Sequence, residues 1–193
     1  KLLKLQMKKL KFNKEIKILD ISNLKNYRLS NKTINLININ YDTNKAFDKI
    51  SNKSKIYIEN SFKAAAIILK SGITDKLING PISKKKFLNK KYPGITEYIA
   101  KKTNTKNIAM LIYNKNLSVC PLTTHIPLKN VHKKVNKKNI FNKIKLIDSF
   151  YKQRKNIRPN IAVLGLNPHC ESTDYFNEDE KIIKPSIKNL NNL

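Results

Sequence analysis

The sequence predicts an α/β fold with a mainly parallel sheet. Two observations support this: short apolar segments typical of strands alternate along the chain with segments whose apolar residues recur every three or four positions, as in helices. The chain has 193 residues, 40% of them hydrophobic, which is enough for a packed core in one domain or two small ones. The longest wholly apolar run, 64–69, is far shorter than the roughly 20 residues of a membrane-spanning helix, so no membrane partner is expected.

The first part of the chain has both kinds of segment. We expect a loose helix over 1–12, strands over 16–21 and 33–39, a loop over 42–55, a helix over 56–71 and a short strand over 76–79. The second strand is the clearest, because Ile34, Leu36 and Ile39 stand among asparagines. Asn60 is the expected N-cap of the helix, and Gly72 is placed to end it.

The second part continues the alternation. We expect a helix over 96–102, strands over 107–113 and 117–122, a helix over 138–153, a strand over 161–166 and a last helix after Asn177. Thr96 is a candidate cap for the first of these helices. In the last, Glu180 stands at the capping-box distance from Asn177, and Pro185 predicts a kink or break.

The net charge of +27 is the most unusual feature of the composition. Such a charge is typical of proteins that bind nucleic acids or anionic membranes. However, only 3 of the 40 basic residues are arginines, and the chain also has 27 Asn and 27 Ile. Lys, Asn and Ile share A/T-rich codons, and the lysines are scattered rather than clustered. We therefore favour genome bias over nucleic-acid binding as the cause of the charge.

Cysteines and histidines are few. Cys120 and Cys170 are not a Cys-x-x-Cys pair, so a disulfide scaffold is excluded and a reducing, cytoplasmic setting is expected. His125 and His169 each follow a predicted strand beside a proline, at the sheet edge where α/β proteins bind ligands. They suit either a divalent metal or ordinary hydrogen bonding, since two imidazoles do not make a site. His132 is expected to be exposed.

Two glycine-containing turns are further candidates for ligand binding. In 80–84, backbone amides with Ser83 and Lys84 would suit a phosphate or carboxylate, but a plain strand-to-helix turn explains the same residues. The segment 94–97, taken alone, is explained equally well as a common helix N-terminus. No Gly-x-Gly-x-x-Gly or Walker loop is present, so the sequence carries no standard nucleotide fingerprint.

Taken in order, these segments resemble the 4-hydroxythreonine-4-phosphate dehydrogenase family of pyridoxal phosphate biosynthesis. Each motif is short, but four in the family's order with similar gaps are specific. The motifs are NGPISK at 79–84, GITE at 94–97, TTHIPL at 123–128 and GLNPH at 165–169, with IIKP at 182–185 in addition.

The resemblance implies a three-layer α/β/α fold like that of isocitrate and isopropylmalate dehydrogenases, in a cytoplasmic homodimer with active sites at the subunit interface. It implies oxidation of a small phosphorylated hydroxy amino acid, 4-phosphooxy-L-threonine, by NAD or NADP. The 3-oxo acid product then loses carbon dioxide to give 3-amino-2-oxopropyl phosphate. It also implies a divalent metal, zinc, magnesium or cobalt, which would stabilise a developing alkoxide or enolate.

Site residues follow from the matched motifs. His125 and His169 match two of the family's three metal-binding histidines, and Thr96 matches a substrate contact. Lys84 is a candidate for the substrate phosphate. Ile95 stands where the family usually has a substrate-binding histidine, and its side chain cannot form a hydrogen bond. This difference keeps open a related substrate, such as phosphothreonate or phosphoerythronate.

Two family segments are missing from this sequence: Gly-Glu-Pro-Ala-Gly-Ile-Gly upstream and Tyr-His-Asp-Gln-Gly, with the third metal histidine, downstream. We therefore expect an internal fragment that is inactive by itself, whose cofactor-binding and catalytic residues are not identified. Residues 1–78 would be part of a first α/β subdomain, and residues 79–193 part of a second that carries the metal-binding histidines.

Overall fold

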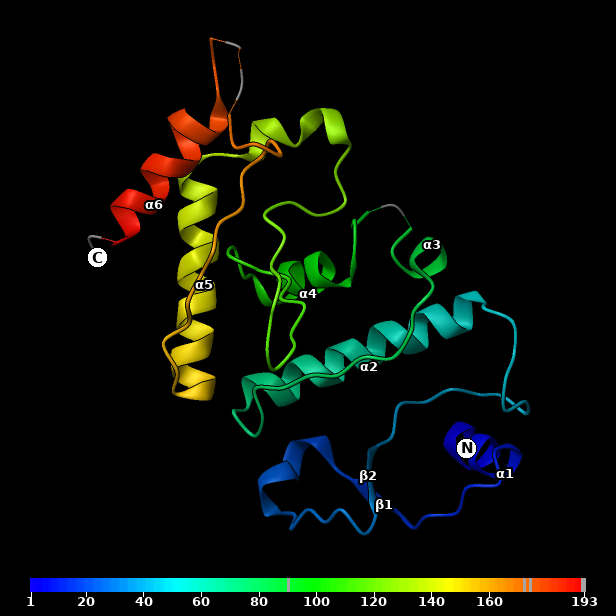
Figure 1. Cartoon of the computed structure of the whole chain (residues 1–193). Helices are drawn as coiled ribbons and strands as arrows, with labels where there is room; N and C mark the ends of the chain where they lie inside the picture. Colours follow the sequence, from blue (N-terminus) through cyan, green and yellow to red (C-terminus); the bar gives the residue numbers. More distant parts are fainter. Residues whose placement is uncertain (90, 172, 174, 192–193) are drawn as a thin grey trace. The chain divides into compact units, whose positions relative to one another are not determined.

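The computed structural model in Figure 1 describes residues 1–89, 91–171, 173 and 175–191. Packing within the chain divides it into two units, Lys1–Lys91 and Tyr92–Leu193. Both predicted metal-binding histidines belong to the second unit. The subdomains predicted from the sequence, 1–78 and 79–193, are a different division and stay a prediction.

The first unit contains the sheet. Its elements are α1 (Leu2–Lys9), β1 (Ile16–Leu19), a 3₁₀ segment (Ile21–Asn26), β2 (Ile34–Ile37), α2 (Asn52–Lys70) and α3 (Lys84–Phe87). β1 and β2 pair in parallel, with Ile16 opposite Ile34 and Leu19 opposite Ile37. The predicted helix at the start of the chain and the first two predicted strands are therefore confirmed, as is a parallel pairing.

Helix α2 begins earlier than the sequence predicted. Ser51 and Ser54 form a reciprocal capping box, in which each side chain bonds the backbone N–H of the other. The predicted cap, Asn60, lies inside the helix, so that prediction is wrong. The end was predicted correctly, because Gly72 follows the helix with φ +75, a conformation that favours glycine.

The second unit is mainly helical. Its elements are α4 (Ile95–Thr103), 3₁₀ turns at Leu128–Asn130 and His132–Lys134, α5 (Lys137–Lys155), a π-helical segment (Asp179–Ile183) and α6 (Lys184–Asn191). α5 matches its prediction closely. The N-cap of α4 is Gly94, so the predicted cap Thr96 is wrong.

The last helix starts as expected but is not regular. Asn177 caps it by accepting hydrogen bonds from the backbone N–H groups of Asp179 and Glu180. The Glu180 carboxylate pairs with Lys184 rather than closing a capping box. The π-helical turn gives way to α6 next to Pro185, which has no N–H to donate to the preceding turn. The break predicted at this proline is thus a change of helix type.

Four other predicted strand regions do not form strands among the described residues. The segments 107–113 and 117–122 meet only in an antiparallel bridge between Ile112 and Val119, and 76–79 and 161–166 have no strand partner within the described part of the chain. A strand exists only through pairing with a neighbour, whatever its apolar pattern. Ile78 is 97% exposed and Leu164 83%.

The core of the second unit lies between α5 and the last helical stretch, which pack against each other near the start of α5 (Figure 1). Val135, Ile140 and Ile183 are its buried centre, and Ile140 is only 3% exposed. Partly buried residues packed against this centre are Leu122, Ile144, Val163, Ile182 and Ile187. Val163 and Leu122 connect the core to the loops that carry His169 and His125.

None of the helices in the described ranges is long and apolar enough to cross a membrane.

Candidate functional site

The GITE and TTHIPL motifs, 29 residues apart, come together at the N-terminus of α4. A Cβ added to Gly94 would lie 3.5 Å from Nε2 of His125 and 2.8 Å from Oε2 of Glu97. The imidazole therefore lies against Gly94, next to Ile95 and Thr96 in the first turn of α4. The structure thus brings a predicted metal ligand beside the predicted substrate-binding residues.

Glu97 connects the two motifs. Its Oε1 accepts a hydrogen bond from the Thr124 hydroxyl at 3.4 Å. Its Oε2 is buried and has no hydrogen-bond partner among the described residues. A carboxylate oxygen in this state can accept a further donor close to His125. No signal in the sequence singles out Glu97, since an acidic residue in a first helical turn is common.

His125 and Thr96 are both exposed, whereas Ile95 is half-buried. His125 has φ +55, in the left-handed region that few non-glycine residues adopt. Such conformations are frequent at functional sites, where the surrounding structure holds them in place. The side chains available at this point can bind a ligand through an imidazole and a hydroxyl.

The second histidine lies in a separate turn. The N–H of Cys170 donates to the carbonyl of Asn167 at 3.0 Å, so 167–170 forms a turn that contains His169. Asp179 lies beneath this turn, and its Oδ1 accepts the N–H of Leu166 at 2.8 Å. His169 is exposed, and Cys170 has φ +56.

A complete metal site is not assembled by the residues that the structure describes. They contain no group of three or more His, Cys, Asp or Glu side chains placed to hold an ion. The donor chemistry still fits, because His125 and His169 offer exposed imidazoles, the commonest nitrogen ligands of zinc and related ions.

Other candidates take less part in the site. Lys84 is exposed at the start of α3 in the first unit, and His132 is exposed as expected. Burial raises the pKa of the Cys120 thiol, which disfavours the reactive thiolate.

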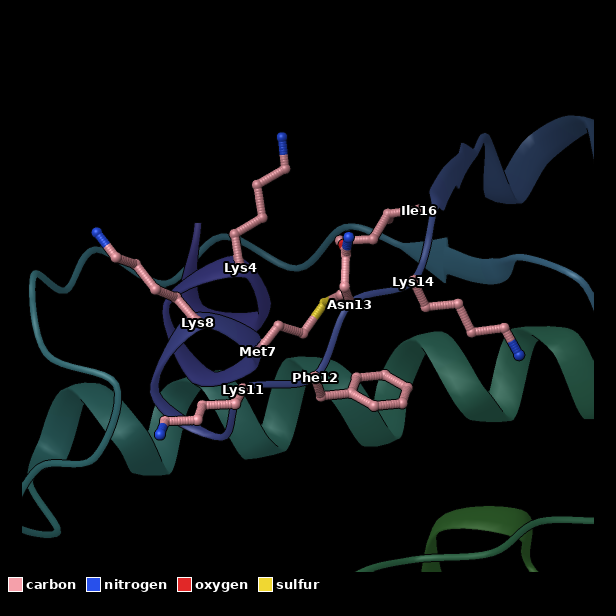
Figure 2. Close-up of a pocket in the computed structure, with 8 residues that line it drawn as sticks. All are labelled: Lys4, Met7, Lys8, Lys11, Phe12, Asn13, Lys14 and Ile16. Carbon is pink, nitrogen blue, oxygen red and sulfur yellow. The ribbon is translucent and has the colours of Figure 1, made fainter.

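Two cavities lie elsewhere. The larger, of about 450 Å³, is lined by α1 and the segment after it (Figure 2). Met7, Phe12 and Ile16 form its apolar part, and the ammonium groups of four lysines around them are directed outward. The smaller, of about 280 Å³, is in the second unit and includes Thr123 and Thr124, next to His125. None of the predicted site residues lines either cavity.

Comparison with known proteins identifies the ancestry of these motifs. The family model described as pyridoxal phosphate biosynthetic protein PdxA matches residues 1–193. The chain belongs to this family. The PdxA assignment covers both units and confirms the resemblance inferred from the four motifs.

The curated relatives of this chain agree with the family assignment. A 4-hydroxythreonine-4-phosphate dehydrogenase from Sulfurihydrogenibium is 36% identical over 161 residues, covering 81% of this chain and 49% of the relative. The enzyme of the same name from Aquifex aeolicus is 39% identical, covering 66% of this chain and 43% of the relative. A D-threonate 4-phosphate dehydrogenase from Pectobacterium atrosepticum is 33% identical, covering 65% and 40%. The chain therefore spans about half the length of the curated PdxA relatives it matches.

Solved structures show the same fold. The 4-hydroxythreonine-4-phosphate dehydrogenase of Klebsiella pneumoniae matches with a TM-score of 0.78 and 26% identity, covering 93% of this chain and 56% of that one. An enzyme of the same name from Burkholderia phymatum gives 0.78 at 24% identity, covering 96% and 57%, and supports the fold alone.

Proposed function

We propose that this chain is part of an NAD(P)-dependent dehydrogenase that oxidises 4-phosphooxy-L-threonine in pyridoxal phosphate biosynthesis. The observation that carries the proposal is the contact between the GITE and TTHIPL motifs, which places His125 against Gly94 and beside Thr96. Membership of the PdxA family and the names of the relatives support the same reaction. The family assignment also accounts for the motifs, which nucleic-acid binding would leave unexplained.

In this reaction hydride leaves the carbon that bears the secondary hydroxyl and passes to the nicotinamide, while the hydroxyl proton is released. The 3-oxo acid then loses its carboxylate as carbon dioxide, giving 3-amino-2-oxopropyl phosphate. We assign Thr96 to substrate binding through its exposed hydroxyl, and Lys84 to the substrate phosphate. The cofactor would be NAD or NADP, and its residues in this chain are not assigned.

We assign His125 and His169 to a divalent metal, zinc, magnesium or cobalt. When bound, such an ion supplies a Lewis acid for the substrate hydroxyl and carboxylate. Because the described residues contain no group of three or more His, Cys, Asp or Glu side chains placed to hold an ion, further ligands would have to come from outside the described chain. A homodimer whose active site lies at the subunit interface would meet this requirement. We propose such a homodimer, located in the cytoplasm, with subunits of three-layer α/β/α fold.

The reaction can be tested in the natural protein that contains this chain. With 4-phosphooxy-L-threonine and NAD⁺ or NADP⁺, we expect the ultraviolet absorbance of the reduced nicotinamide to rise. D-threonate 4-phosphate is the comparison substrate, because some relatives are named for it and Ile95 lacks a hydrogen-bonding side chain. Faster turnover of D-threonate 4-phosphate would transfer the assignment to that substrate, and no turnover of either would contradict the proposed function.

The metal assignment has a built-in control, because the chain has three histidines. In a calorimetric titration with Zn²⁺, we expect His125→Ala and His169→Ala each to weaken binding at least about tenfold, since each removes a ligand. His132→Ala should bind like the unmodified protein. Equal losses in all three variants would indicate scattered surface binding and would refute the site.

A further inference from the structure

The most buried side chain in the described structure is a carboxylate. Asp179 is only 1% exposed, at the start of the π-helical segment before α6. A buried carboxylate is costly unless donors surround it. Here Oδ1 accepts the N–H of Leu166 at 2.8 Å, and Oδ2 accepts the N–H and the side-chain amide of Asn167 at 3.3 and 3.4 Å.

All three donors belong to the residues that enter the turn of His169. Asn167 is held on Asp179 at one end, and its carbonyl accepts the N–H of Cys170 at the other. His169 stands between these two points. Its backbone is therefore fixed on both sides, although its own side chain is exposed.

The neighbouring residues are arranged to admit this carboxylate. A Cβ added to Gly165 would lie 2.8 Å from Oδ1 of Asp179, so any larger residue would push the carboxylate away from the turn. Asp179 is itself fixed, because its N–H donates to Oδ1 of Asn177 at 2.9 Å. The helix start and the turn thus form one hydrogen-bonded unit with the carboxylate at its centre.

We propose that Asp179 is a positioning residue that holds the Asn167–Cys170 turn so that His169 is presented as a ligand. The inference rests on the proposed function for the metal role of His169, but the order of the turn can be measured separately. Carboxylates that orient ligand-bearing groups commonly change metal affinity about 10- to 100-fold when they are replaced.

Asp179→Asn tests the inference while keeping the shape of the side chain. The amide keeps one acceptor oxygen and turns an NH₂ group toward the other backbone donor. In hydrogen-exchange NMR without metal, we expect at least one of the Leu166 and Asn167 amides to exchange about 10- to 100-fold faster. The amides of α5 should keep their protection. The affinity for Zn²⁺ should fall by about 10- to 100-fold.

Glu178→Gln is the matched control, since it makes the same charge change one residue away without altering the carboxylate that bonds the turn. It should leave both amides and the Zn²⁺ affinity unchanged. Unchanged exchange in Asp179→Asn would overturn the inference, and so would general loss of protection through α5, because Asp179 would then support the whole unit. Absence of Zn²⁺ binding in the unmodified protein would refute the metal assignment, while the exchange result would still decide whether Asp179 holds the turn.

Discussion

Replacing Ile140 with alanine should destabilise the second unit by about 2–5 kcal/mol, the usual cost of truncating a buried isoleucine. Ile140 lies in the first turns of α5 at the centre of the core, together with Val135 and Ile183. Its removal takes apolar contacts from both α5 and the last helical stretch. Urea unfolding followed by circular dichroism, with hydrogen exchange of the α5 amides as a local probe, measures the loss.

Ile157→Ala is the control for this experiment. Ile157 follows α5 in the same unit and is 57% exposed, so its truncation should change stability by no more than about 0.5 kcal/mol. Equal losses in the two variants would show that α5 and the last helical stretch are not held together by this core. A loss confined to Ile140→Ala would confirm that the packing around Ile140 holds α5 and the last helical stretch together.

The sequence predicted helices better than strands, for a physical reason. α5 carries its own signals, since its capping residue and its apolar stripe lie within one segment. A strand also needs a partner, which its own residues do not specify. The predicted segments 16–21 and 33–39 contain strands that pair with each other, whereas the equally apolar 161–166 has no strand partner among the described residues.

Two of the predicted helix caps were wrong. Asn60 and Thr96 are good capping residues by type, but Ser51 and Gly94 occupy the capping positions. A residue's preference for the capping position does not determine at which residue the backbone enters the helical conformation. At the end of α2, by contrast, the left-handed conformation is nearly specific to glycine, so Gly72 was informative.

The candidate site was predicted only in part. The motifs identified His125, His169 and Thr96, and the structure brings His125 to the first turn of α4. The roles of Glu97 and Asp179 depend on hydrogen bonds to residues 27 and 12 or 13 positions away in the chain. No local pattern distinguishes Asp179 from the acidic residues on either side of it.

Replacing Gly165 with alanine should disrupt the turn that carries His169. The new Cβ would lie 2.4 Å from Sγ of Cys170, 2.8 Å from Oδ1 of Asp179 and 3.2 Å from the carbonyl oxygen of Asn167. Asp179 cannot withdraw without losing its bonds to Leu166 and Asn167. We expect a loss of about 1–3 kcal/mol in the stability of the second unit, as for other overpacked sites, together with faster exchange of these two amides.

Two further variants test what causes this loss of stability. Gly80→Ala is a control at a glycine with free space around it, and Cys170→Ala removes one of the close contacts. Gly80 has no atom within 4 Å of an added Cβ and no positive φ, so its replacement should be neutral or slightly stabilising. Cys170→Ala, combined with Gly165→Ala, removes the closest contact but leaves the one with Asp179. The double variant should therefore recover only part of the lost stability. Full recovery of stability would mean that the thiol alone caused the clash. Partial recovery, with fast exchange persisting at the Leu166 and Asn167 amides, would show that Gly165 is needed for the approach of Asp179 to the turn.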